Sequence, residues 1–112
     1  MLEAEEEPIF QPFFRGFGTM PEFEYDLIKS TTNKEKHGVD FEGVKTIWEG
    51  DSVILPAITK GEQRYMIIGK IKSDLYSCIF TIRGEKIRII SCRRSKKNER
   101  RSYHEKIREN NI

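Results

Sequence analysis

Three short apolar runs in the second half of the chain constrain its fold more than any other feature. The runs are YMIIG, LYSCIFTI and IRIIS, all within Glu62–Arg94, and polar breaks at Lys70–Asp74 and Arg83–Lys86 separate them. Each run is rich in β-branched and aromatic residues and is too short for an independent helix. Gly84, in the second break, can adopt the positive φ that a tight hairpin requires. The pattern therefore predicts a three-stranded antiparallel meander.

Two helices are predicted before the meander. Asp26 is a favourable N-cap for a helix over Leu27–Lys36, and Gly38 follows that helix as a terminating glycine. Asp40 is placed to cap a second helix, Phe41–Glu49, whose apolar residues recur at helical spacing. The second helix has the stronger apolar stripe and is expected to supply most of the helical core.

Strands flank these helices, and a charged helix follows the meander. The alternation in Phe23–Tyr25 predicts a short strand, and Ser52–Ala57 predicts another, with Pro56 favouring a sheet edge or a strand end. Ser95–Asn110 favours a helix with one thin apolar stripe that can pack on the sheet. The order β-α-α-β-β-β-β-α predicts an α+β domain: an antiparallel β-meander sheet with two N-terminal helices and one C-terminal helix, all on one side of the sheet.

Residues 1–20 differ from the rest of the chain in composition. An acidic run leads into an aromatic patch that Pro and Gly interrupt, without helical or strand periodicity. We interpret these residues as a poorly ordered tail before a domain at residues 21–110. Two alternatives stay open: Met20 is the true start, or the aromatic residues dock on the domain or on a partner. The aromatic residues of this patch are Phe10, Phe13, Phe14 and Phe17.

The composition predicts a small cytoplasmic protein without a membrane contact, a metal or a cofactor. The chain has 112 residues, of which 34% are charged, and no apolar run approaches the roughly 20 residues that span a bilayer. Its N-terminus is acidic, unlike the basic start of a signal peptide. Cys78 and Cys92 lie in predicted strands without metal-ligand spacing, so we expect buried thiols that do not bind zinc. The two thiols cannot form a bridge if they face opposite sides of the sheet.

Positive charge is concentrated near the C-terminus. The chain has a formal net charge of +2, yet residues 83–108 hold eleven Lys and Arg residues against three Glu residues. Such a basic segment favours an anionic partner, although a solvated charged surface is the simpler alternative.

Two segments of the chain match the sequence pattern of a known family. The first, FEYDLIKSTTNKEKHGVDFEGV, contains Asp26, Asn33 and the run Lys36-His37-Gly38-Val39; the second, GEQRYMIIG followed by FTIRGEKIRIISCRRSKKNERRSYHE, contains an Arg-Ile-Ile-Ser-x-Arg run. In order and spacing these segments resemble the BrnT family, ribonuclease toxins of bacterial type II toxin–antitoxin systems. The resemblance covers residues 22 to about 107, with Tyr25 where the family usually has Trp and Ser95 where Ala is commoner.

The resemblance implies a fold, an activity and partners. The fold would be a small RelE-like domain, and the activity would be RNA cleavage that inhibits translation and growth. A BrnA-like antitoxin with a ribbon-helix-helix would neutralise the toxin. The complex would repress its own operon, so operator DNA would be contacted only through the antitoxin complex.

The arginines of the predicted strands suit a metal-independent ribonuclease. Cleavage requires a proton acceptor for the 2′-hydroxyl, stabilisation of the charge on phosphorus and a proton donor for the leaving 5′-oxygen. One guanidinium group can bind two phosphate oxygens at once. We therefore predict that Arg64, Arg83 and Arg93 bind the phosphate and stabilise the transition state. Simple alternation puts Arg88 and Arg93 on opposite faces of one strand, and we favour Arg93 for the catalytic site.

The remaining assignments concern proton transfer and RNA binding. His37 and Lys36 are the favoured proton-transfer residues, although Lys36-His37-Gly38 could equally serve only as a helix stop. Further candidates for proton transfer are Glu62, Glu99, Tyr103 and His104. The residues expected to bind RNA are Arg88, Arg94, Lys96, Lys97, Arg100, Arg101 and Tyr103.

Two other functions fit the same sequence. One is a nucleic-acid-binding module that uses the basic surface without catalysis, and the other is an interaction protein that docks through its C-terminal helix. Loss of cleavage with retained binding in an Arg93→Ala variant would favour the enzyme, whereas weaker binding alone would favour the module.

Overall fold

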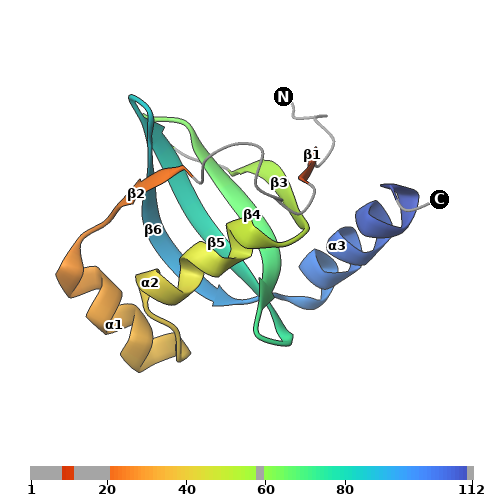
Figure 1. Cartoon of the computed structure of the whole chain (residues 1–112), viewed down its shortest axis with the longest axis horizontal. Coiled ribbons are helices and arrows are strands. Elements are labelled where there is room, and N and C mark those ends of the chain that lie inside the picture. Colours follow the sequence, from red (N-terminus) through yellow and green to blue (C-terminus); the bar gives the residue numbers. More distant parts are fainter. Residues whose placement is uncertain (1–8, 12–20, 58–59, 111–112) are drawn as a thin grey trace.

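A six-stranded sheet with helices packed on both faces forms the described part of this computed structural model, which covers residues 9–11, 21–57 and 60–110 (Figure 1). The strand order is β1-β3-β4-β5-β6-β2. The elements, in chain order, are β1 (Ile9–Gln11), β2 (Glu22–Glu24), α1 (Leu27–His37), α2 (Phe41–Val44), the 3-10 helix η1 (Lys45–Glu49), β3 (Ser52–Ala57), β4 (Arg64–Ile71), β5 (Asp74–Arg83), β6 (Lys86–Arg94) and α3 (Lys97–Asn110).

The predicted α+β fold class and the predicted meander are confirmed. Strands β3 to β6 are antiparallel neighbours in chain order, and Gly84 in the β5–β6 turn has the predicted positive φ, 61°. The sheet also contains one parallel pair, because β2 runs alongside the start of β6.

Strand β1 was not predicted from the sequence. Its residues, Ile9–Gln11, pair antiparallel with Ser52–Ile54 of β3, more than 40 positions further along the chain. Residues 9–11 are therefore a sheet edge, contrary to the interpretation of residues 1–20 as a tail without strand structure. The rest of that predicted tail, and the side chains of all of its aromatic residues with the alternatives proposed for them, lie outside what the structure describes.

The first predicted helix forms with both of its predicted ends. The Asp26 carboxylate accepts the backbone N–H of Lys29 at 3.0 Å, and Gly38 ends the helix with a φ of 83°. The second predicted helix is instead divided into α2 and η1. The tighter winding of η1 brings residues three apart into line, so that Val44 and Ile47 both point inward and are fully buried.

Polar contacts hold α1 against the sheet. The buried Asn33 side chain donates to the carbonyl of Val39 at 2.8 Å and accepts the backbone N–H of Cys92 at 3.1 Å. Nearby, the Ser30 hydroxyl accepts the backbone N–H of Phe41 at 2.9 Å. These bonds explain how a helix with little apolar surface stays docked.

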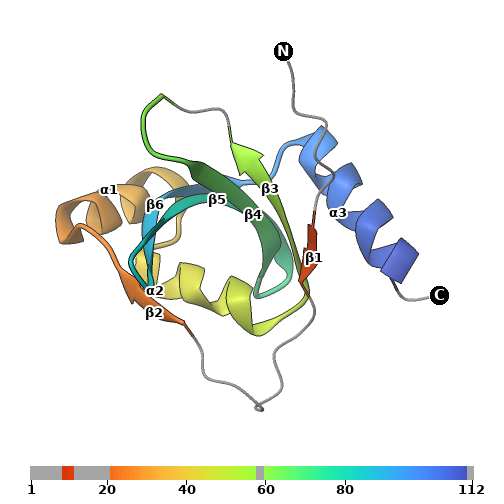
Figure 2. The same ribbon diagram turned by 90° about the horizontal axis from the view of Figure 1, so that it is seen from above.

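Two apolar cores lie on opposite faces of the curved sheet. Helices α2 and η1 fill the concave face, where Trp48 and Phe80 are in edge contact, with ring centroids 5.2 Å apart. Helix α3 lies outside the curve, where its Tyr103 packs with Val53 and Ile68 (Figure 2). The prediction that all helices lie on one side was therefore wrong, because adjacent residues of β4 alternate between a core for α2 and η1 and a core for α3.

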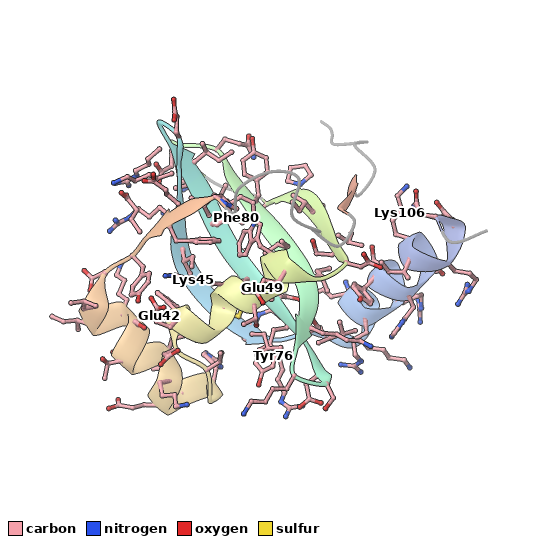
Figure 3. The ribbon with its side chains drawn as sticks, in the orientation of Figure 1. Glu42, Lys45, Glu49, Tyr76, Phe80 and Lys106 are labelled. Atoms are coloured by element: carbon pink, nitrogen blue, oxygen red, sulfur yellow. A yellow bond between two sulfur atoms is a disulfide. The ribbon has the colours of Figure 1, made fainter. Side chains whose placement is uncertain are left out.

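A surface cluster joins Tyr25, the residue after β2, to α2 and η1. Tyr25 donates a hydrogen bond to Glu42. The Lys45 ammonium lies 2.9 Å from the same carboxylate (Figure 3). The hydrogen bond to Glu42 raises the pKa of Tyr25 to about 12 and lowers the pKa of Glu42.

The prediction of two free thiols was also wrong. Cys78 and Cys92 are direct cross-strand partners in β5 and β6, with their Cα atoms 4.0 Å apart, and they form a disulfide. Both are buried, as expected, but they face the same side of the sheet. Among the described residues, no helix is both long enough and apolar enough to span a membrane.

Candidate active site

A β-bulge in β6 determines which arginines share a face of the sheet. Ile79 pairs with Ser91 and Phe80 pairs with Ile89, so Ile90 is an extra residue without a partner on β5. Such a residue reverses the alternation on either side of it.

Arg88 and Arg93 consequently lie on the same face. Arg88 pairs with Thr81 and Arg93 pairs with Ser77, and these two residues of β5 are four positions apart on one face. The expectation that Arg88 and Arg93 lie on opposite faces was wrong because simple alternation takes no account of the bulge.

The convex face carries a pocket of about 130 Å³ at the end of the sheet nearest the β5–β6 turn. We call it the arginine pocket. It brings together three arginines from three neighbouring strands and the first turn of α1. Its lining residues are Asp26, Lys29, Glu62, Arg64, Arg83, Arg88, Ile89 and Ile90.

Carboxylates organise the guanidinium groups of the pocket. A Glu62 oxygen lies 3.5 Å from Arg83 and 3.8 Å from Arg64, while Arg88 is paired with Glu24 of β2 at 3.2 Å. The Nε atom of Arg64 is buried without a hydrogen-bond partner among the described residues. The side chains of Arg64 and Arg83 are about half exposed, at 41% and 52%, so their charges remain accessible to a solute.

The start of α1 forms the wall of the pocket beside β6. The backbone N–H of Lys29 lowers the pKa of Asp26, so this carboxylate is ionised beside the arginines. Lys36 lies on the same side of α1 as Lys29, roughly 10 Å further along the helix axis. His37 is the last residue of α1. Lys36 and His37 are exposed, and neither lines the arginine pocket.

Arg93 lies outside the pocket, about 13 Å along the sheet from Arg88, because the two pair with residues four positions apart on β5. Its guanidinium makes two hydrogen bonds with Glu99 of α3, at 2.8 and 2.9 Å. Glu99 also accepts from the Ser77 hydroxyl and from the backbone N–H of Lys96, both at 2.8 Å. The bond from Arg93 is the main reason why the pKa of Glu99 falls to about 2, and Glu99 in turn raises the pKa of Arg93.

The residues predicted to bind RNA are dispersed. Arg94 lies on the other face of β6, over the ring of Tyr76 and 3.0 Å from Asp74. Arg100 donates to the carbonyl of Ser95 at 2.7 Å, and Tyr103 is buried in the core beneath α3. Only Arg88 of the predicted RNA-binding residues lines the arginine pocket. The predicted RNA-binding residues exposed just before or at the start of α3 are Lys96, Lys97, Arg100 and Arg101.

Three residues that line the arginine pocket were absent from the predicted catalytic set. Asp26 was predicted only as a helix cap, Glu62 only as one of several proton-transfer candidates, and Lys29 had no predicted chemical role. Their common signal is position: Asp26 caps α1, Lys29 lies in the first turn of α1, and Glu62 lies two residues before the start of β4.

A second hollow lies behind the arginine pocket, on the concave face. Its volume is about 330 Å³, and apolar side chains line it. Three pairs of consecutive residues divide between the two sites: the apolar member of each pair lines the hollow and the arginine lines the pocket. The pairs are Arg64-Tyr65, Ile82-Arg83 and Ile87-Arg88.

Comparison with known proteins identifies the family of the chain. None of the curated proteins matches it. A family model described as "Ribonuclease toxin, BrnT, of type II toxin-antitoxin system" matches residues 25–99, more than half of the chain, and this range includes the whole arginine pocket. The chain therefore belongs to the BrnT family of ribonuclease toxins of type II toxin–antitoxin systems.

Proposed function

We propose that this protein is an endoribonuclease that cleaves RNA in the arginine pocket without a metal ion. The observation that carries the proposal is the convergence of Arg64, Arg83 and Arg88 from three adjacent strands onto one open pocket. Each guanidinium group can bind two phosphate oxygens at once, and it keeps its charge at any working pH. Membership in a family of ribonuclease toxins supports the same activity.

The proposed reaction is a transesterification within the RNA strand. Arg64 and Arg83 bind the scissile phosphate and stabilise the extra negative charge that develops on phosphorus. The carboxylate of Glu62, between these two arginines, accepts the proton of the 2′-hydroxyl. The O2′–P bond forms as the P–O5′ bond breaks, and the leaving 5′-oxygen takes a proton from water. The products are a 2′,3′-cyclic phosphate and a 5′-hydroxyl.

Lys36 and His37 lie outside the pocket, and Lys36 is roughly 10 Å beyond Lys29 along α1, which is too far for proton transfer to the bound phosphate. We propose instead that they bind RNA that runs from the pocket along α1. Lys29 supports this path, since it lines the pocket and shares one side of the helix with Lys36. For Arg93 we propose a different role from the one expected from the sequence. Its paired bonds to Glu99 suit an anchor that fixes α3 to the sheet.

The family implies an antitoxin, and we propose that it is a BrnA-like protein with a ribbon-helix-helix. Toxin and antitoxin together would bind operator DNA through the antitoxin. The toxin would act on RNA in the cytoplasm and so inhibit translation and growth. The exposed cations Lys96, Lys97 and Arg101 would add salt-dependent RNA affinity away from the pocket.

The test is cleavage of RNA by the purified chain in the presence of EDTA, with and without ribosomes, followed by mapping of the RNA ends. Expected products carry 2′,3′-cyclic phosphate or 3′-phosphate ends, and Arg83→Ala should abolish them. Absence of cleavage under all of these conditions would overturn the enzyme proposal. Salt-sensitive binding without cleavage would instead favour the non-catalytic binding module.

A further inference from the structure

Strands β1 and β2 are the opposite edges of the sheet, and residues 12–21 join them in the chain. Figure 2 shows the two strands on either side of the open, concave side of the curved sheet. The last residue of β1, Gln11, pairs with Ser52 at the start of β3. The first residue of β2, Glu22, pairs with Lys86 at the start of β6. The β1–β2 connection therefore has to pass the four strands between them.

The length of this connection determines which face of the sheet it crosses. The row of paired residues that contains Gln11 reaches Tyr76 on β5, and the row that contains Glu22 reaches Arg83 on the same strand. The two ends are therefore about 33 Å apart along the sheet, while the extended chain between them reaches about 36 to 40 Å. A path around the outside of the curve is longer than the sheet itself and meets α3, so the connection crosses the concave face.

The apolar hollow lies on that path. Its lining extends from Ile54 of β3 to Ile87 of β6. Phe80 and Ile82, its lining residues on β5, lie between the rows of the two ends. The side chain of Ile82 is 56% exposed although it is apolar, and such surface gains free energy when another apolar group covers it.

The connection carries side chains that suit this hollow. It contains three phenylalanines, and its Pro and Gly residues interrupt any regular helix or strand. A cavity of about 150 Å³ holds benzene, so the hollow, at about 330 Å³, has room for roughly two phenyl rings. Trp48, Tyr65 and Phe80 line it with aromatic surface on which further rings pack favourably. The three phenylalanines are Phe13, Phe14 and Phe17.

We propose that residues 12–20 cross the concave face and that their phenylalanine rings fill the apolar hollow. The connection thereby completes the core on this face and ties the two edges of the sheet together. Of the alternatives that the sequence leaves open for the aromatic patch, this one docks it on its own domain. Docking of these rings does not require RNA cleavage, so either proposal can fail without the other.

The direct test is NMR of the full chain with labelled isoleucine methyl groups. Nuclear Overhauser cross-peaks should connect the methyl groups that line the hollow to rings of the connection, which leucine substitutions assign one at a time. Ile68, buried on the convex face, is an internal control without such cross-peaks. The lining isoleucines are Ile54, Ile82 and Ile87.

Absence of every such cross-peak would overturn the proposal and leave the hollow open to an outside partner. Cross-peaks between a labelled chain and an unlabelled chain would also overturn it, because a second copy would then supply the rings.

Thermal melting tests the same contact by substitution. Phe13→Ser/Phe14→Ser/Phe17→Ser should lower the melting temperature by roughly 5 °C or more, because it removes apolar burial. Leu2→Ser is the matched control: it also removes an apolar side chain, but one before β1, and should melt as the parent does.

A double-mutant cycle identifies the partner of the rings. Ile82→Ser should lower the melting temperature of the parent but change that of the triple variant little, because the rings that contact Ile82 are already gone. Equal shifts in both backgrounds, or a loss in Leu2→Ser as large as in the triple variant, would overturn the proposal. If the triple variant does not fold, the cross-peaks of the parent chain still decide.

Discussion

Arg88 and Arg93 project from the same face of β6, yet they make contacts of different kinds. Ile90 bulges between them and puts both guanidinium groups on the convex side of the sheet. Arg88 lines the arginine pocket, whereas Arg93 is bound to Glu99 at the start of α3. A shared face therefore does not make these two arginines one site, and substitutions should separate their effects.

Arg88→Ala should lower RNA cleavage by roughly a hundredfold, because it removes a cation from the pocket where charge develops on phosphorus. Unfolding of the variant, followed by circular dichroism, should change much less. Arg108→Ala is the control, because Arg108 is exposed near the end of α3 and outside the pocket. Equal losses of cleavage in the two variants would mean that the pocket is not where RNA is cleaved.

Protonation of Glu99 should make the protein less stable in acid. The pKa of Glu99 is about 2 in the folded chain, against an ordinary value of 4.5, so its carboxylate stabilises the fold fully above about pH 5. This stabilisation, about 2 to 3 kcal/mol, should disappear as the pH falls from about 5 toward 2. Urea unfolding across that range should show the loss in the parent chain, and Glu99→Gln should be less stable at pH 7 with a flatter dependence. Parallel curves for both proteins would contradict the assignment.

Asn33→Ala should cost about 2 to 4 kcal/mol of unfolding free energy. The change removes two hydrogen bonds and leaves the Cys92 N–H and the Val39 carbonyl unpaired. Thermal unfolding measures the effect, with Asn98→Ala on the exposed surface of α3 as the control. If both variants melt together, the Asn33 contacts do not hold α1 to the sheet.

Gly69→Ala should destabilise the protein by about 1 to 3 kcal/mol. A Cβ at Gly69 would lie 2.7 Å from the Cγ2 atom of Ile47 in η1, too close for β4 and η1 to keep their packing. Gly50→Ala is a matched control, since no atom lies within 4 Å of its added Cβ. Denaturant midpoints should fall only for Gly69→Ala, and equal midpoints would show that η1 shifts freely.

Much of the fold could be predicted from local sequence. Alternation and turn residues predicted the strands of the meander, and Asp26 and Gly38 marked the ends of α1 because caps depend on neighbouring residues. Contacts between residues far apart in the chain could not be predicted from local sequence. Strand β1 depends on β3 far along the chain, and the disulfide depends on the register of β5 and β6.

The site was only partly predictable for the same reason. Of the three arginines assigned to the phosphate from the sequence, Arg64 and Arg83 line one pocket, since they lie at the ends of adjacent strands, and Arg93 does not. The run Ile89-Ile90 gives no local indication of a bulge, so Arg88 was assigned to the wrong face. The roles of Glu62 and Lys29 appear only when the strands and α1 converge on one pocket.

The arginine pocket and the hollow depend on the same alternation of side chains along the strands. In each of the three consecutive residue pairs, one residue lines the pocket and its neighbour lines the hollow. A single-residue insertion or deletion within β4, β5 or β6 would move an arginine into the apolar hollow and an apolar side chain into the pocket. Substitutions can therefore diversify either face independently, whereas length changes in these strands would damage both faces at once. Relatives that keep this pocket should vary in the lengths of their turns and termini rather than within these three strands.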